Sequence, residues 1–272
     1  MRTDIFKDVT ARQNQVLWLL LAFQGGFMNT GGFLACHRFV SHMSGYGTYV
    51  GVDLGQGRYL GAFEMAFAPL FFLAGAIYSG WLVDRRIILQ QEPRLERGMI
   101  VMAALNLFIY LGEFSGWLGT FGEPLVLQRD FLLLFALCFA CGLQNGLFTG
   151  LTKGQVRTTH LTGPITDIGL NLVKARTLER HDPERASLSM LNVLRVKVVL
   201  SFLSGSLIAT LVFTQMTYEG FAVPAAISLF LNWYVRIVLK VGGGDSLERH
   251  PASLLVHVKP SATPGGTVKP SR

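Results

Sequence analysis

Charged residues are scarce in this sequence, and their scarcity argues against a soluble fold. Asp, Glu, Lys and Arg make up only 15% of the 272 residues, whereas hydrophobic residues make up 50% and phenylalanine occurs 20 times. Soluble domains carry about a quarter charged residues. The 24 basic residues outnumber the 17 acidic ones, but no basic stripe with interleaved aromatics occurs, so we expect no nucleic-acid partner. Composition therefore indicates a membrane protein, with the lipid bilayer as its surroundings.

Six apolar segments are long enough to cross a bilayer as helices. A hydrocarbon core of about 30 Å needs roughly 20 apolar residues. The first segment follows a basic arm but lacks the cleavage site of a signal peptide, so we expect it to remain as a helix. The sequence predicts an all-α, polytopic transmembrane helical bundle. The predicted spans are residues 16–36, 60–83, 98–118, 130–150, 195–214 and 219–239.

Basic residues lie mostly on one side of these spans. With a cytoplasmic N-terminus, all but Arg38, Arg58 and Arg129 of the 24 Lys and Arg fall on the cytoplasmic side, as the positive-inside rule requires. We therefore expect a bacterial inner-membrane protein with both termini in the cytoplasm. The expected domains are a cytoplasmic arm over 1–15, a transmembrane domain over 16–240, and a disordered, Gly-, Pro- and Ser-rich tail over 241–272.

One polar motif occurs twice. Residues 41–54 read SHMSGYGTYVGVDL, residues 159–172 read THLTGPITDIGLNL, and five of the fourteen positions are identical. The flanks repeat in the same order. Before the motif, Gly26 and Asn29 correspond to Gly142 and Asn145; after it, FLAGAI at 72–77 corresponds to FLSGSL at 202–207. Small residues in these last segments let neighbouring helices approach closely.

Each copy of the repeat contains three predicted helices. Because three is odd, the second copy is expected to be inverted in the membrane, which is a plan of many secondary transporters. Repeat 1 spans about 16–118 and repeat 2 about 130–239. We expect the first motif at the outer face and the second at the cytoplasmic face. Each is expected as a Gly-rich re-entrant or interfacial segment, since full crossings would put the basic loop over 85–97 outside.

Polar residues of the repeat are the candidate substrate-binding residues. The amides could line a central cavity or could hydrogen-bond between helices. The hydroxyls of Ser44 and Thr162 could cap helices whose positive ends face a solute. The histidines could relay protons or bind a loop carbonyl. The full set is Asn29, His42, Ser44, Gly45, Thr48, Gln144, Asn145, His160, Thr162, Gly163, Thr166 and Asp167.

No catalytic, metal or cofactor site is predicted. Serine lies beside His42, but no orienting acid completes a nucleophilic site. Cys138 and Cys141 form a C-x-x-C pattern, which on an apolar helix we interpret, with Cys36, as packing residues. No P-loop occurs, so ATP-driven transport would need another chain.

Four stretches together resemble the YoaK-like family of bacterial multi-pass inner-membrane proteins, a domain of unknown function. They are GGFMNTGGFLACHRFVSHMSG at 25–45, FLAGA at 72–76, CGLQNG at 141–146 and VRTTHLTGPITDIG at 156–169. The resemblance covers about residues 15–240. The family commonly has Asn directly after the first motif glycine, where this chain has Tyr46. The resemblance implies a multi-pass membrane protein and supplies no substrate or reaction.

The inverted repeat with its Gly-interrupted segments leads to a functional hypothesis. We expect a secondary transporter or channel-like carrier for a small polar solute, with the paired motifs gating opposite faces. The alternatives are a non-transporting membrane scaffold or sensor and, third, a membrane-embedded enzyme. The transporter hypothesis predicts a hydrated cavity at the membrane midplane, lined by Asn29, Gln144, Asn145 and the motif hydroxyls, and a dry, fully packed centre would count against it. Oligomerisation is left open by the sequence.

Overall fold

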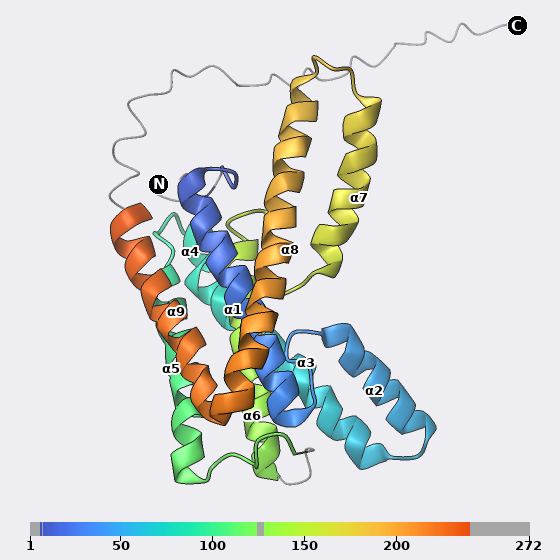
Figure 1. The fold of residues 1–272 in the computed structure, drawn as a ribbon, viewed down its shortest axis with the longest axis vertical. Helices are drawn as coiled ribbons and strands as arrows, with labels where there is room; N and C mark the ends of the chain where they lie inside the picture. The colour runs from blue at the N-terminus through green and yellow to red at the C-terminus, as the bar shows by residue number, and fades with distance from the viewer. Residues whose placement is uncertain (1–5, 7, 124–127, 240–272) are drawn as a thin grey trace, which may run out of the picture.

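The computed structural model describes residues 6, 8–123 and 128–239, and every regular element within them is helical (Figure 1). The predicted tail over 241–272 and most of the first residues of the arm lie outside the described residues. The elements are α1 (Arg12–Cys36), α2 (Met43–Gly55), α3 (Tyr59–Leu82), α4 (Asp84–Ile88), α5 (Leu95–Ser115), α6 (Gln128–Thr149), α7 (Thr162–Thr177), α8 (Pro183–Met216), η2 (Thr217–Phe221), α9 (Ala222–Tyr234) and η3 (Val235–Leu239).

Five helical stretches in the described residues are long and apolar enough to cross a membrane. The last of them, Pro183–Ile237, is 55 residues long and contains both α8 and α9. At its bend, η2 follows Met216 and Thr217 takes a positive φ of 41°, so that the chain reverses direction and α9 runs back packed mainly on α5 (Figure 1). This stretch therefore holds the fifth and sixth predicted spans. The other four are Arg12–Cys36, Tyr59–Ile88, Leu95–Ser115 and Phe131–Thr149.

Local sequence signals account for the ends of several helices. The carboxylate of Asp182 accepts a hydrogen bond of 2.8 Å from the Glu184 N–H, and Pro183 occupies the first helical position, so α8 begins there. Helix α1 ends where His37 adopts a left-handed conformation, φ 55°, and its N–H binds the Phe33 carbonyl. The signal at His37 sets where α1 ends and where the polar segment before α2 begins. The signal at Asp182 sets where α8 begins after the turn that follows α7.

The long helices pack in two matching pairs, α1 along α8 and α3 along α6. In the first pair an added Cβ on Gly26 would collide with the Phe202 carbonyl oxygen. In the second pair, Gly142 stands in the same way against the Phe72 carbonyl oxygen. Both contacts join corresponding residues of the two sequence repeats. Close backbone approach at glycine is thus the packing role that the small-residue pattern predicts.

The reverse contacts match as well. Gly205 on α8 stands against the Phe23 carbonyl of α1, and Gly75 on α3 stands against the Phe139 carbonyl of α6. Gly75 and Gly205 are the central glycines of FLAGAI and FLSGSL. Each crossing is therefore closed by one glycine from each partner. A side chain at any of these four positions would force the helix axes apart.

Two shorter helices lie at the side of this bundle. Helix α2 packs mainly on α3, and α7 packs mainly on α8. Figure 1 shows that they begin close together near the middle of the bundle and diverge, α2 toward the lower end and α7 toward the upper end. The two motif copies supply these helices.

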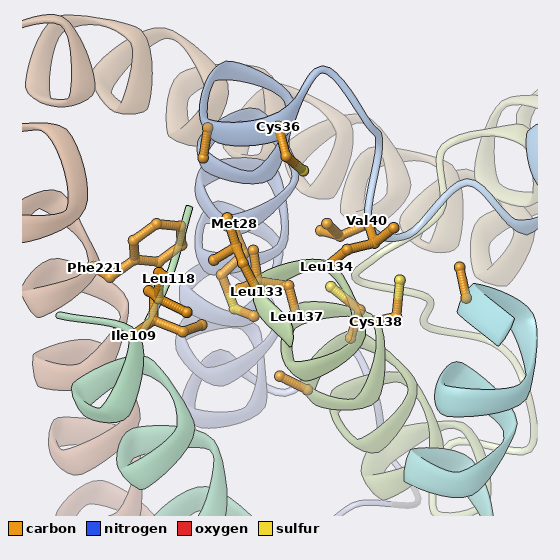
Figure 2. Close-up of a cluster of buried hydrophobic side chains, with 14 of the residues drawn as sticks. Met28, Cys36, Val40, Ile109, Leu118, Leu133, Leu134, Leu137, Cys138 and Phe221 are labelled. Atoms are coloured by element: carbon orange, nitrogen blue, oxygen red, sulfur yellow. The ribbon is translucent and has the colours of Figure 1, made fainter. Parts of the chain in front are cut away.

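The core contains small and aromatic side chains that fill the space between α1, α5 and α6. Figure 2 shows Met28 and Cys36 from α1 facing Leu134, Leu137 and Cys138. All three cysteines are free and buried. The interpretation of the C-x-x-C pattern as packing residues agrees with this placement.

Candidate functional site

An amide on α1 holds the segment that precedes α2. The Oδ1 atom of Asn29 accepts hydrogen bonds from the Val40 N–H at 3.1 Å, the Ser41 N–H at 3.2 Å and the Ser41 hydroxyl at 3.0 Å. Residues 37–42 return from the end of α1 toward the middle of the bundle, and main-chain donors there have no helical acceptors. Asn29 supplies the acceptor that this irregular backbone needs away from water.

Two amides on α6 do the same for the segment that precedes α7. The Oδ1 atom of Asn145 accepts from the Thr159 hydroxyl at 3.3 Å. The amide nitrogen of Gln144 donates to the Leu21 carbonyl at 2.7 Å and to the Thr158 hydroxyl at 3.2 Å. Asn29 and Asn145 correspond in the repeat, so both copies use one device to position a polar segment.

The first turns of α2 and α7 leave main-chain N–H groups without acceptors. The residues that precede these helices, His42 and Leu161, make no side-chain capping bond. The hydroxyls of Thr48 and Thr166 donate to carbonyls one turn back in their own helices. Capping by the Ser44 and Thr162 hydroxyls was therefore the wrong alternative, because both residues lie inside the first turn. Among described residues, the N–H groups of Met43, Ser44, Thr162 and Gly163 have no acceptor.

A cavity of about 480 Å³ lies where these two first turns meet. It is bounded by residues of both motif copies and by one arginine just before the second copy. The lining residues are Ser41, His42, Met43, Ser44, Arg157, His160, Thr162, Gly163, Thr166 and Asp167.

The expectation that the two motifs lie at opposite faces is wrong for their polar starts. Both histidines border one cavity, and only the far ends of α2 and α7 point to opposite ends of the bundle (Figure 1). The physical reason is the pinning by Asn29 and Asn145, which draws both segments inward before their helices begin.

Seven of the twelve candidate residues line the cavity, and five do not. Those outside the lining are Asn29, Gly45, Thr48, Gln144 and Asn145. The three amides are not among its lining residues: Asn29 and Asn145 hold the segments that carry the lining residues, and Gln144 also bonds the Leu21 carbonyl of α1, which is the helix-to-helix alternative. The lining residues that were not among the candidates are Ser41, Met43 and Arg157.

His160 is the more enclosed of the two histidines. It lies in the loop between α6 and α7, outside the membrane-spanning helices, with its ring 5.8 Å from that of Phe72. Burial lowers the pKa of His160, and the nearby Arg157 and His42 lower it further, while a hydrogen bond to the Ser41 main chain acts in the opposite direction. The neutral imidazole is therefore favoured near pH 7.

The two charged residues in the lining are in different situations. Asp167 forms an ion pair of 3.1 Å with Arg195 on α8. Arg157 makes no ion pair or hydrogen bond with another described residue. Its guanidinium packs over Gly163, where an added Cβ would come within 2.7 Å of Nη1. The cavity thus contains one guanidinium without a carboxylate partner.

Tyr46, which departs from the family pattern, faces the core. It is 1% exposed, and its hydroxyl donates to the Phe39 carbonyl at 2.8 Å. We expect Tyr46→Phe to lower the free energy of unfolding by about 1 kcal/mol, because a buried carbonyl loses its donor. Thermal unfolding of the purified protein measures the effect. Tyr49→Phe is the matched control, since no described acceptor binds the exposed Tyr49 hydroxyl, and an equal loss in both variants would contradict the prediction.

The histidines have no partner arrangement that indicates catalysis or metal binding. Within the described ranges, no hydrogen bond joins either histidine to a carboxylate or a side-chain hydroxyl. No group of three or more His, Cys, Asp or Glu residues gathers in those ranges either. The arrangement offers hydrogen-bond donors and one cation.

Five apolar helical stretches of spanning length indicate an integral membrane protein, and a small cavity lies where its two side helices begin. The chain belongs to the family described as "Protein of unknown function (DUF1275)", whose family model matches residues 17–234. This match confirms the resemblance to the YoaK-like family. Comparisons with curated proteins and with solved structures gave no match.

Proposed function

We propose that this protein is a secondary transporter or channel-like carrier for a small polar solute in the bacterial inner membrane. The observation that carries the proposal is the single cavity bordered by the starts of both motif copies. Transporters with inverted repeats bind their solutes at the junction of the repeats, where interrupted helices offer main-chain groups. The free N–H groups of α2 and α7 are groups of this kind.

The exchanged packing partners support an inverted repeat. The first helix of each unit, α1 or α6, packs along the second long helix of the other unit, α8 or α3. Corresponding glycines make corresponding contacts at the two crossings. In Figure 1, α1 and α6 run in opposite directions, as do α3 and α8. Two units related in this way have similar energies when their roles are exchanged, which suits a carrier that opens alternately to each side.

Alternating access would follow from movement of one pair of helices against the other. Because α2 packs mainly on α3, and α7 mainly on α8, each short helix can move with its own long partner. The cavity is lined by the starts of α2 and α7 and by the segments before them, and these two helices pack on different pairs. In place of gates at opposite faces, we propose one shared site that opens toward either end of the bundle.

The positions of basic residues support a cytoplasmic upper end in Figure 1. Arg85 and Arg86 lie on α4, and Arg180 lies in the turn between α7 and α8. Both α4 and this turn are toward the upper end of the bundle, as is the start of α1 (Figure 1). Arg58, in the turn between α2 and α3, lies at the other end. The positive-inside rule then places the start of α1 and the end of η3 on the cytoplasmic side.

Uptake into proteoliposomes tests the proposal. We expect His42→Ala and His160→Ala each to reduce solute uptake roughly tenfold, the effect of losing about 1.4 kcal/mol of interaction with the solute. His181→Ala is the matched control, because His181 is exposed in the turn between α7 and α8, away from the cavity. We expect it to behave as wild type.

Two results would contradict the proposal. If wild-type vesicles take up no anionic, neutral or cationic solute faster than empty vesicles, the scaffold or sensor alternative takes its place. If His42→Ala and His160→Ala transport as fast as wild type, the cavity is not the path of the solute.

A further inference from the structure

We infer that the cavity binds a small anion with oxygen acceptors, such as a carboxylate or an inorganic oxyanion. As an assignment of the transported solute, the inference rests on the proposed function; as an assignment of a binding site, it stands on the cavity itself. Its basis is an arginine of the cavity lining that pairs with no described carboxylate, together with the hydrogen-bond donors beside it.

The lining contains one arginine and one aspartate, and only the arginine is left without a described carboxylate partner. Asp167 is the only carboxylate among the lining residues, and Arg195 already compensates it at 3.1 Å. Arg157 has no carboxylate partner within the described part of the chain. A guanidinium presents paired N–H donors that match a carboxylate or oxyanion in a bidentate geometry. An anion in the cavity would compensate Arg157.

The main chain adds donors from two directions. The N–H groups of Met43 and Ser44 come from the first turn of α2, and those of Thr162 and Gly163 from the first turn of α7. These helices are 13 and 16 residues long, so their positive ends reinforce the same preference. Among the lining side chains, the hydroxyls of Ser44 and Thr162 and the imidazole of His42 donate to no described acceptor and add to these donors, whereas the hydroxyls of Ser41 and Thr166 are already engaged.

A cation or an apolar solute fits this lining poorly. A cation would meet Arg157 and two helix N-termini, with its only carboxylate already engaged. An apolar solute would cover free N–H groups and a guanidinium without supplying acceptors, and buried donors without acceptors are costly. An anion satisfies both the charge and the donors.

Gly163 is a positioning residue for Arg157. Because an added Cβ would approach Nη1 to 2.7 Å and Cδ to 3.3 Å, alanine at this position would displace the guanidinium. In the first copy Phe39 stands at the corresponding position, and the neighbouring Arg38 is not among the lining residues. The cavity therefore has one strong anion-binding side chain, and one substitution removes it.

Equilibrium dialysis of the purified full chain in detergent tests the inference. The probes are radiolabelled acetate, sulfate and inorganic phosphate, with radiolabelled glycerol and choline as neutral and cationic controls, at constant ionic strength. We expect saturable binding of at least one anion and of neither control. Arg157→Gln should weaken that binding tenfold or more, Arg157→Lys should weaken it less, and Gly163→Ala should also weaken it. Arg180→Gln, an exposed arginine in the turn between α7 and α8, should bind as wild type.

Binding of none of the three anions by the wild type would overturn the inference. So would equal binding by Arg157→Gln and wild type, with both eluting as a single folded species in size-exclusion chromatography. The proposed function fails separately. If an anion binds but does not cross a proteoliposome membrane, the anion site is supported and the transporter proposal is wrong. If a neutral or cationic solute is transported and no anion binds, the inference of an anion site is wrong and the transporter proposal is supported.

Discussion

Gly26→Ala and Gly142→Ala are each expected to destabilise the protein by about 3 kcal/mol, the upper part of the range for overpacking a close contact. In each variant the new methyl group would collide with a carbonyl oxygen, that of Phe202 or that of Phe72. Main-chain oxygen in a helix cannot rotate away as a side chain can, so the crossing helices must separate. Thermal and denaturant unfolding in detergent measure the loss.

Gly51→Ala and Gly169→Ala are the matched controls. These glycines also correspond in the repeat and lie in helices α2 and α7, but an added Cβ on either would meet nothing within 4 Å. Alanine is a better helix former than glycine by up to about 1 kcal/mol, so we expect unchanged or slightly increased stability. If all four variants lose the same stability, close approach at Gly26 and Gly142 does not limit the packing.

Asn29→Leu is expected to cost about 3 kcal/mol and to loosen the segment before α2. The variant leaves the Val40 and Ser41 N–H groups and the Ser41 hydroxyl without their acceptor, and each unsatisfied buried donor costs about 1 kcal/mol or more. Unfolding experiments measure the loss of stability. Hydrogen exchange should also show faster exchange at the Val40 and Ser41 amides, which reports directly on the pinned segment.

Two further variants set the scale for this effect. Asn145→Leu removes the acceptor of a single hydroxyl, that of Thr159, and should cost less than Asn29→Leu. Thr48→Ala removes an exposed hydroxyl that bonds only within α2, and should change stability by no more than about 0.5 kcal/mol. If Asn29→Leu behaves like Thr48→Ala and leaves amide exchange unchanged, Asn29 does not hold the segment.

Much of the fold follows from residue patterns along the chain. Helices of spanning length depend on local composition, and the predicted span over 16–36 lies within α1 as the span over 195–214 lies within α8. The packing role of Gly75 and Gly205 was also readable, because small residues in apolar helices indicate close contact. The matched order of motifs was visible for the same reason, since it needs only comparison of the chain with itself.

The functions of the three amides could not be predicted from residue patterns along the chain. Asn29, Gln144 and Asn145 were predicted to line the cavity or to bond between helices, and the residue types suit both roles. Hydrogen bonds to Ser41, Thr158 and Thr159 assign them to the segments beside the cavity. These bonds depend on where the chain returns after a helix, which no periodic pattern encodes.

Arg157 was missed for a related reason. In the sequence it stands among the basic residues that indicate orientation, and the repeat aligns it with Phe39, so a search for symmetry passes over it. A basic residue stands just before each copy of the motif, Arg38 and Arg157, and only the tertiary structure shows that Arg157 lines the cavity.

Composition, helix lengths, and the repeated order of motifs were therefore determined by local chemistry: apolar runs must form helices in a bilayer, and small residues permit contact. The meeting of the two motif copies in one cavity, together with an arginine that pairs with no described carboxylate, was decided only by the tertiary structure. It depends on which helices pair and on hydrogen bonds between residues distant in sequence, and both are set by the packing of the whole bundle.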